Sequence, residues 1–304
     1  MSKPVIISVG GGKGGVGKST ITANVGSVLV KNNFSVGFID ADLGGANLHL
    51  CLGVRRPQTG LQDFIKGSSK TLKDTAVTTT LPNSWLISGA SDILELANPN
   101  FAQKQKLIRN LTSMEADYIF VDLGAGSDFH VTDFYAAFQY GIIVTDGLPT
   151  SIENAYGFLK SSIVRGLTRL FAGKKKIQDR IRQFTDPQTG RGYATVGEMI
   201  DGVGKDFPEI VEPARTWLQQ RRTLLVLNMV REAEDIKVGE RFTEMVRKYL
   251  SIRMNYIGYV VFTPEMRKSV KMLQPIVDFS ADNKATECFT SIAQNLVVLT
   301  RGNG

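Results

Sequence analysis

The segment that decides the fold is Val5-Ile6-Ile7-Ser8-Val9, followed by Gly10-Gly11-Gly12-Lys13-Gly14-Gly15-Val16-Gly17-Lys18-Ser19-Thr20. A short apolar run leads into a glycine-rich loop, and residues 21–29 then place apolar side chains at helical spacing. Glycines let a loop turn with positive φ and bring its N–H groups against phosphate oxygens, and the dipole of the following helix adds to the attraction. A bare glycine turn requires neither the lysine–serine ending nor both flanking elements, so the segment predicts a phosphate-binding loop.

Two side chains of this loop have predicted chemical roles. Lys18 should reach the β- and γ-phosphates of a nucleotide, and Ser19 should coordinate Mg²⁺. Backbone N–H groups supply the other phosphate contacts. We therefore expect ATP or ADP to bind with Mg²⁺ at Gly12, Lys13, Gly14, Gly15, Val16, Gly17, Lys18, Ser19 and Thr20.

Seven short apolar runs alternate with amphipathic segments of helical length. The runs are continuous rather than alternating in polarity, which indicates strands covered on both faces. We expect an α/β fold with a doubly wound, mostly parallel sheet of about seven or eight strands flanked by helices, and ligands at the carboxyl ends of the strands. The predicted strands are 5–9, 36–39, 85–87, 118–121, 142–145, 224–227 and 256–261.

Residues 172–222 break this rhythm, because they contain no convincing strand and carry Pro187, Pro208 and Pro213. We interpret this segment as a largely helical insertion. The chain has 304 residues and 42% hydrophobic content, enough for a single large domain. We therefore expect one domain over residues 1–304 with the insertion at 172–222.

Composition excludes several classes of protein. No window approaches the roughly 18–20 apolar residues that a membrane span needs, and no charged segment with a cleavage site opens the chain. We expect a cytoplasmic protein. Cys51 and Cys288 lie far apart without a CxxC pair, which favours ordinary buried thiols over a disulfide framework or a zinc site.

Lys13 adds a more specific signal, because a generic phosphate loop does not require a lysine directly after its first glycine. The sequence KGGVGKST at residues 13–20 resembles the deviant Walker A motif of the MinD/ParA family of SIMIBI-type P-loop NTPases. That resemblance implies a homodimer formed on ATP binding, in which Lys13 reaches the phosphates held by the partner subunit. The alternative for Lys13 is a solvated loop lysine.

Two further segments resemble motifs of the same family. Residues 38–48, with Asp40 and Asp42, are similar to its switch I, and residues 119–126, with Asp122, to its Walker B and switch II. The resemblance implies that Asp42 orients or polarises the attacking water, that Asp40 supports the magnesium shell, and that Asp122 holds Mg²⁺ through water. Lys13, Lys18 and Asp42 are then the catalytic residues. Carboxylates that end strands can also cap helices or form turns.

Adenine contacts in this family usually come from two late segments of the chain. Asn228 at the end of a predicted strand is one candidate, and Pro264 with Glu265 is the second. Asn228 could equally cap the following turn.

Residues 149–160 resemble the FlhG (FleN, YlxH) branch, which controls the number and placement of flagella. Residues 146–148 depart from the turn that is usual in that branch. The resemblance implies an ATP-hydrolysing switch with a regulatory protein partner. The alternatives are a ParA-like DNA partition ATPase and a MinD-like septum-site regulator.

Residues 284–301 show an apolar stripe at helical spacing, and their polar face has almost no lysine or arginine to meet anionic lipid. We interpret this segment as a helix docked on the core rather than the basic membrane-targeting helix of MinD, and peripheral contact with the inner membrane stays open. The stripe consists of Ala285, Cys288, Phe289, Ile292, Ala293, Leu296 and Leu299.

The net charge of +7 comes from the second half of the chain, because residues 1–150 contain as many acidic as basic residues. Residues 160–182 hold eight basic residues and one acid, Asp179. Three interpretations remain for this stretch: a solvated helix face, a contact with an acidic partner or membrane surface, and a nonspecific DNA patch.

Overall fold

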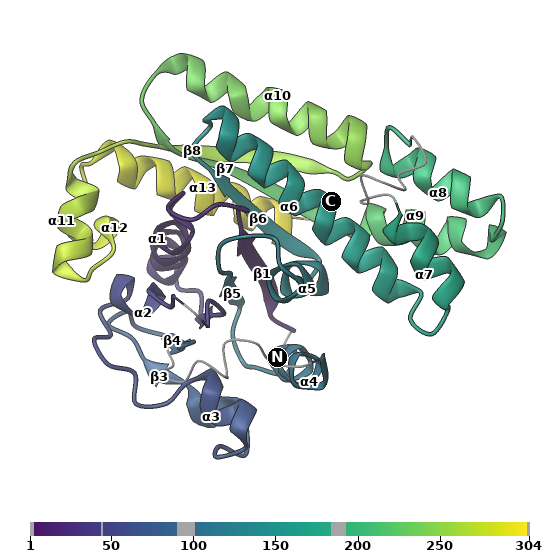
Figure 1. Ribbon diagram of the computed structural model, residues 1–304. Coiled ribbons are helices and arrows are strands. Elements are labelled where there is room, and N and C mark those ends of the chain that lie inside the picture. The colour runs from purple at the N-terminus through teal and green to yellow at the C-terminus, as the bar shows by residue number, and fades with distance from the viewer. Residues whose placement is uncertain (1–2, 44, 90–100, 184–192, 303–304) are drawn as a thin grey trace.

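The computed structural model describes residues 3–43, 45–89, 101–183 and 193–302, and an eight-stranded sheet forms its centre (Figure 1). The strand order is β3-β4-β2-β5-β1-β6-β7-β8, and every pairing is parallel except that of β3 with β4. The strands are β1 Val5–Gly10, β2 Val36–Asp40, β3 Val77–Thr78, β4 Ser84–Ile87, β5 Tyr118–Asp122, β6 Tyr140–Thr145, β7 Arg222–Val230 and β8 Met254–Val261.

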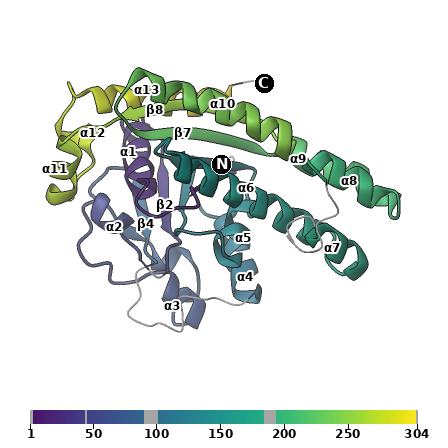
Figure 2. The same cartoon turned by 45° about the horizontal axis from the view of Figure 1, so that its top comes forward.

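Helices cover both faces of this sheet (Figures 1 and 2). On one face, α1, α2, α12 and α13 share a core with the strands, and α3 to α10 pack on the other face. The predicted doubly wound α/β fold is confirmed. The helices are α1 Lys18–Lys31, α2 Leu48–Cys51, α3 Leu61–Lys66, α4 Phe101–Leu111, α5 Phe129–Ala137, α6 Pro149–Leu170, α7 Lys175–Arg182, α8 Val196–Gly204, α9 Val211–Gln220, α10 Ala233–Leu250, α11 Glu265–Met272, α12 Ile276–Phe279 and α13 Lys284–Arg301, with 3₁₀ turns at Lys73–Thr75 and Pro208–Ile210.

The strands show why their sequences are continuously apolar. Successive side chains of a strand point to opposite faces, so Ile6 joins one core layer and Ile7 the other. Ile119 and Phe120 divide in the same way on β5. Because both faces are buried, neither set of alternate residues is polar.

The helix α13 docks through its apolar stripe, as predicted. Ala285, Phe289 and Leu296 are fully buried against the sheet, and Asn295 Nδ2 donates a hydrogen bond of 2.9 Å to the Ile257 carbonyl of β8. The predicted stripe is too long by one position, because Leu299 is 36% exposed near the end of the helix. No helix in the described ranges has the length and apolarity required to cross a bilayer.

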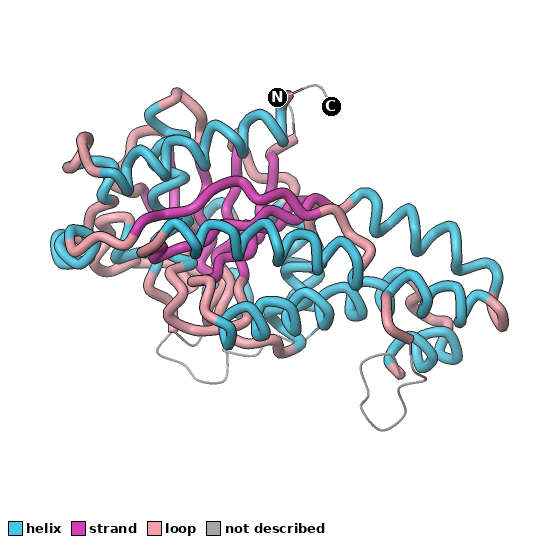
Figure 3. Tube along the Cα trace, turned by 90° about the horizontal axis from the view of Figure 1, so that it is seen from above, coloured by secondary structure: helices cyan, strands magenta, loops and turns pink. Residues whose placement is uncertain are grey.

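The described part of residues 172–222 folds as α7, α8, a 3₁₀ turn and α9, and its last residue, Arg222, opens β7. These helices pack on the ends of α6 and α10, which extend beyond the strands (Figures 2 and 3). Ile177, Met199 and Leu218 are buried in the same core as the sheet. Residues 184–192 of the predicted insertion lie outside the described residues.

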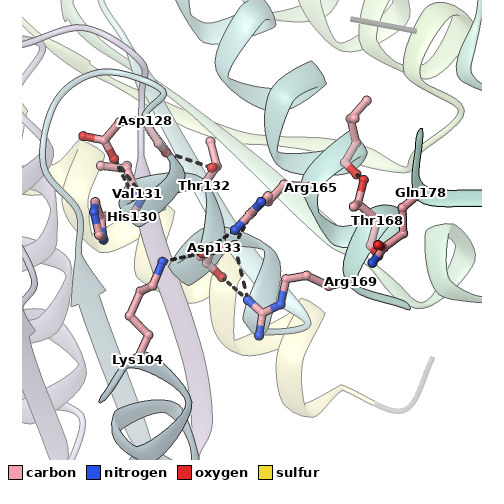
Figure 4. Close-up of polar contacts among 11 residues, drawn as sticks. Lys104, Asp128, His130, Val131, Thr132, Asp133, Arg165, Thr168, Arg169 and Gln178 are labelled. Carbon is pink, nitrogen blue, oxygen red and sulfur yellow. Dashed lines mark hydrogen bonds and ion pairs between the residues drawn. The ribbon is translucent and has the colours of Figure 1, made fainter. Parts of the chain in front are cut away.

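A buried carboxylate joins three of these helices (Figure 4). Asp133 of α5 is 1% exposed and accepts Lys104 Nζ of α4 at 2.5 Å and Arg165 Nε of α6 at 2.6 Å, with Arg169 Nη1 at 3.5 Å. Burial by itself raises the pKa of Asp133, but the hydrogen bonds and charges of Arg165 and Lys104 outweigh it, so the pKa is lowered. The ionised carboxylate therefore holds α4 and α6 against α5.

We predict that Asp133→Asn lowers the free energy of unfolding by about 3 kcal/mol, because it leaves the buried Lys104 ammonium without a counter-charge. Urea denaturation at pH 7 measures this difference. Asp282→Asn, at an exposed position, serves as the control and should change stability by less than about 0.5 kcal/mol.

The pH dependence of this stability difference tests whether it comes from the charge of Asp133. The folded-state pKa of Asp133 lies below its unfolded value, so the carboxylate stabilises the fold fully above about pH 4 and progressively less as the pH falls through the folded-state pKa. The difference between wild type and Asp133→Asn should therefore narrow in acid. A difference that stayed constant down to pH 3 would contradict the electrostatic explanation.

Candidate nucleotide site

The glycine loop lies at the centre of the sheet, because β1 is paired with β5 on one side and β6 on the other. Gly12 has φ of +71°, and a Cβ atom there would lie 2.3 Å from the carbonyl oxygen of Asn154 on α6. Gly17 has φ of +91°, and its Cβ would lie 2.2 Å from Asn228 Nδ2. Any side chain at these two positions is therefore excluded both by the backbone conformation and by space.

The two lysines of the loop lie in different environments. Lys18 is buried, and its Nζ donates to the Lys13 carbonyl at 3.4 Å across the loop. Burial lowers the pKa of Lys18, and the negative charges of Asp122 and Asp42 act in the opposite direction. Lys13 is only half-buried, and its Nζ lies 3.3 Å from Ser151 Oγ in the first turn of α6.

Ser19 and Asp122, the two residues predicted to hold Mg²⁺, are in contact, and their role as metal ligands stays a prediction. Ser19 Oγ donates to Asp122 Oδ2 at 2.5 Å, while Asp122 Oδ1 is buried and has no hydrogen-bond partner among the described residues. Burial raises the pKa of Asp122, which the Ser19 hydroxyl and the Lys18 charge oppose. A hydroxyl and a carboxylate with an unused buried oxygen are hard oxygen donors that fit Mg²⁺ beside nucleotide phosphates.

Asp40 lies directly opposite Asp122 in the parallel pairing of β2 with β5. Its two carboxylate oxygens accept the backbone N–H groups of Asp42 at 3.2 Å and Leu48 at 3.0 Å. Burial raises the pKa of Asp40, and the neighbouring charge of Asp122 raises it further. Asp40 therefore shapes the loop that carries Asp42, which is the turn-forming alternative that the sequence left open for carboxylates at strand ends. Support for the magnesium shell stays a prediction for Asp40.

Asp42 lies close to residues 119–126, the segment that carries Asp122. A Cβ atom at Gly124 would lie 3.2 Å from the Asp42 carboxyl carbon, so glycine at 124 allows this close approach. The segment of Gly124 is in turn joined to the phosphate loop, because the Gly126 N–H donates to the Gly12 carbonyl at 3.1 Å. Asp42 and Asp122 both act on the charge of Lys18, so the three side chains lie near one another at the carboxyl ends of β1, β2 and β5. Gly44, in the predicted switch I, lies outside the described residues.

Asn228 contacts the loop from the other side. It is buried, and its Nδ2 donates to the Val16 carbonyl at 2.9 Å. The next residue, Met229, has φ of +60° at an irregularity in the pairing of β7 with β8, and its side chain is exposed. This strained position turns Asn228 inward, so that its amide braces the loop, and adenine contact remains a prediction.

The second segment predicted to contact adenine, Pro264 and Glu265, has fewer contacts with the phosphate loop than Asn228 has. The Phe262 N–H donates to the Val230 carbonyl at 2.8 Å, which places the segment at the same sheet edge as Asn228. Pro264 caps α11, and the exposed Glu265 carboxylate accepts the Thr263 hydroxyl. In the described part of the chain, no hydrogen bond joins Pro264 or Glu265 to the loop.

The residues that converge here are a glycine loop, two lysines, a hydroxyl and three carboxylates, the set that phosphoryl transfer from a Mg²⁺–nucleotide requires. Residues 3–155 also match the family model described as ParA, NUBPL iron-transfer P-loop NTPase. The chain belongs to the MinD/ParA family of P-loop NTPases.

Two proteins of known name, YlxH and FleN, are similar in sequence to this chain. Flagellum site-determining protein YlxH of Helicobacter pylori is 36% identical over 156 residues, which are 51% of this chain and 52% of that protein. Antiactivator FleN of Pseudomonas aeruginosa is 24% identical over 294 residues, 96% of this chain and 85% of that protein. The chain thus spans about half the length of YlxH and most of FleN.

Solved structures show the same fold. The septum site-determining protein MinD of Pyrococcus horikoshii, determined with Mg-ADP, has a TM-score of 0.65 and 20% identity, and the match covers 97% of each chain. The chain therefore shares its fold with this MinD structure, while the identity is too low to carry over individual contacts.

We predict that Asn228→Ala weakens ATP binding by about tenfold, because the buried Val16 carbonyl loses its hydrogen bond. The predicted contact of Asn228 with adenine would be lost in addition to the brace on the loop, so GTP binding should fall by less. Titration with fluorescent ATP and GTP analogues measures both affinities. Equal losses for the two nucleotides would restrict Asn228 to bracing the loop.

Proposed function

We propose that this protein is an ATP-dependent molecular switch that dimerises around Mg²⁺–ATP, hydrolyses it, and controls the number or placement of flagella. The observation that carries the proposal is the second lysine of the loop. Lys18 is buried within the site of its own chain, whereas Lys13 is half-buried and its Nζ contacts Ser151 of α6. This difference supports a role for Lys18 at the nucleotide of this subunit and for Lys13 at the nucleotide of a partner subunit.

The roles of the remaining residues follow from their positions. Lys18 holds the β- and γ-phosphates, and the loop N–H groups orient them. Ser19 and Asp122 would hold Mg²⁺, which when bound draws negative charge from the phosphate oxygens. Asp42 accepts a hydrogen bond from the attacking water and aims it at the γ-phosphate. Asp40 keeps Asp42 in place through the two backbone hydrogen bonds of its loop.

The contact of Lys13 with Ser151 defines the resting position of the lysine. A hydrogen bond of 3.3 Å to a neutral hydroxyl is weak compared with a contact to a phosphate. Exchange of Ser151 for a phosphate of the facing subunit is therefore favourable once two ATP-bound chains meet. ATP, rather than ADP, supplies the negative charge that draws Lys13 away from α6.

The flagellar role is supported by two observations. Residues 149–160, which form the first turns of α6, resemble the FlhG branch and pack on Gly12 of the loop. The chain is also similar to YlxH, a flagellum site-determining protein. A regulatory protein partner belongs to this proposal, as does Mg²⁺ as the metal.

Ion pairs within the chain weigh against the alternative of a nonspecific DNA patch at residues 160–182. Five of the eight basic residues in this stretch have a carboxylate partner, and such pairing reduces the positive potential that attracts DNA phosphates. The pairs are Arg165 and Arg169 with Asp133, Lys174 with Glu209, Arg180 with Asp206, and Arg182 with Asp179. Plain duplex DNA should therefore show no salt-sensitive gel shift.

We predict different losses for the two lysine substitutions. Lys18→Ala should weaken ATP binding by about a hundredfold or more, because it removes the buried charge beside the phosphates. Lys13→Ala should keep ATP affinity within about threefold of wild type and yet fail to dimerise with ATP. Calorimetry measures the affinity, and light scattering after gel filtration measures the dimer.

Lys237→Ala, at an exposed position of α10, is the charge-matched control and should behave as wild type. If Lys13→Ala dimerised with ATP and hydrolysed it normally, the assignment of Lys13 to the facing subunit's nucleotide would be wrong.

We predict that Asp42→Ala slows phosphate release by about a hundredfold or more, the typical contribution of a group that positions or activates water. ATP binding and the ATP-dependent dimer should persist, because Asp42 makes no hydrogen bond to the glycine loop within the described residues. Phosphate release by wild type and by Asp42→Ala is compared at saturating ATP. Rates of zero in both would mean that the chain uses ATP only to dimerise.

The cellular role is tested with the same variants in the source organism. Cells that lack the gene, or carry Lys13→Ala in its place, should show a wrong number or placement of flagella by electron microscopy. Normal flagella together with misplaced septa or lost chromosomes would favour a septum-site regulator or a partition ATPase.

A further inference from the structure

A second site lies beside the nucleotide site, between α5, α6 and α7. It is a cavity of about 550 Å³, and the phosphate loop contributes none of its lining residues. Phe129 and Thr132 of α5 form one wall, and Val164, Arg165 and Thr168 of α6 form another. The lining therefore combines apolar side chains, hydroxyl groups and a guanidinium. None of these five residues has a role in the proposed nucleotide chemistry.

Arg165 has unused hydrogen-bonding capacity in this cavity. Its side chain is 26% exposed, and it donates from Nε to Asp133 Oδ1 at 2.6 Å and from Nη2 to Asp133 Oδ2 at 3.2 Å (Figure 4). These two bonds use two of the five N–H donors of a guanidinium, which are held in a rigid planar fork. In the described part of the chain the other three donors of Arg165 bond to nothing. One edge of the Arg165 guanidinium is therefore held by Asp133, and the other edge can donate hydrogen bonds to a ligand.

Phe129 supplies an apolar surface next to this guanidinium. Its side chain is 69% exposed, although it opens α5, and the Arg165 guanidinium carbon lies 4.8 Å from the centre of its ring. One face of the ring is thus occupied by the cation, and most of the rest is in water. A large exposed aromatic side chain beside an arginine is a combination that is enriched where proteins bind partners.

The charge of the surrounding cluster favours an acidic ligand. Lys104 and Arg165 bring two positive charges to the single buried carboxylate of Asp133, and Arg169 makes a further contact with it. The negative charge of Asp133 is thus shared, and a second carboxylate would be attracted to the exposed edge of Arg165.

We propose that this cavity binds a short segment of a partner protein in which an acidic and an apolar side chain are neighbours. The carboxylate of the segment accepts the unused N–H donors of Arg165, and the apolar side chain packs on Phe129. The hydroxyl groups of Thr132 and Thr168 donate to backbone carbonyls and both residues are buried, so the contacts proposed for the segment are those with Arg165 and Phe129.

The cavity is also connected to the nucleotide site. Its lining residue Ser127 directly follows Gly126, and Phe129 lies two residues further along the chain. The Gly126 N–H is bonded to the Gly12 carbonyl of the phosphate loop. A change of the loop on ATP binding therefore moves the wall that carries Phe129, so the partner segment binds differently in the two nucleotide states. This coupling rests on the proposed ATP switch, whereas binding in the cavity does not.

The test is an NMR titration of the nucleotide-free protein with the tripeptide acetyl-Asp-Leu-Asp-amide, and acetyl-Asn-Leu-Asn-amide is the matched neutral probe. The acidic peptide should shift the Arg165 Nε–H and Phe129 amide resonances, and the neutral one should not. Phe129→Ser and Arg165→Lys should each weaken binding by about tenfold. Arg241→Gln, which removes an exposed positive charge from α10, should bind as wild type.

Three results would overturn the peptide site: equal shifts with the neutral peptide, equal shifts with sodium phosphate at the same concentration, or full affinity in both Phe129→Ser and Arg165→Lys. Phe129→Ser stays informative even if Arg165→Lys folds poorly, because the Phe129 side chain is mostly in solvent. The titration is then repeated with ATP. An unchanged peptide affinity in a chain that still dimerises with ATP would overturn the coupling and leave the ATP switch intact.

Discussion

Two carboxylates, Asp40 and Asp122, are buried side by side at the ends of adjacent parallel strands, and the rest of the site is arranged around this unfavourable pair. Burial and like charge both disfavour their ionised forms. Asp40 is satisfied by backbone N–H groups of the following loop, and Asp122 by the Ser19 hydroxyl and the charge of Lys18. One oxygen of Asp122 remains without a partner in the described chain, which is consistent with the proposed role of this carboxylate in holding Mg²⁺ at the end of β5.

The phosphate loop is held by backbone contacts and by the side-chain amide of Asn228. Gly12 touches α6 and accepts a hydrogen bond from Gly126, while Gly17 touches Asn228 at the end of β7. A movement of the loop would therefore displace three elements that are far apart in sequence: α6, the segment of Gly126 and the end of β7. The same packing that makes glycine obligatory at these positions connects the nucleotide to α6 on one side and to Phe129 on the other.

Local sequence was sufficient to predict the sheet, the loop and the docked face of α13, because each depends on patterns within a few turns or strands. The short edge strand β3 was missed, since a strand of two partly exposed residues has no apolar run. The contacts of Lys13 with Ser151 and of Arg165 with Asp133 join residues 138 and 32 positions apart. Local sequence singles out Lys13 but shows neither that it contacts Ser151 nor that Arg165 contacts Asp133, because these partners meet only once the helices are packed.

The length of α6 means that a small tilt of this helix beside the phosphate loop becomes a larger displacement at its far end. This helix begins beside Lys13 and continues for 22 residues to the helices α7 and α9, a distance of about 33 Å at 1.5 Å per residue. A tilt of about 5° at the loop would displace the far end of such a rod by about 3 Å. The helices at that end, which lie beyond the residues matched by the family model, are thus placed where a small displacement at a phosphate is largest.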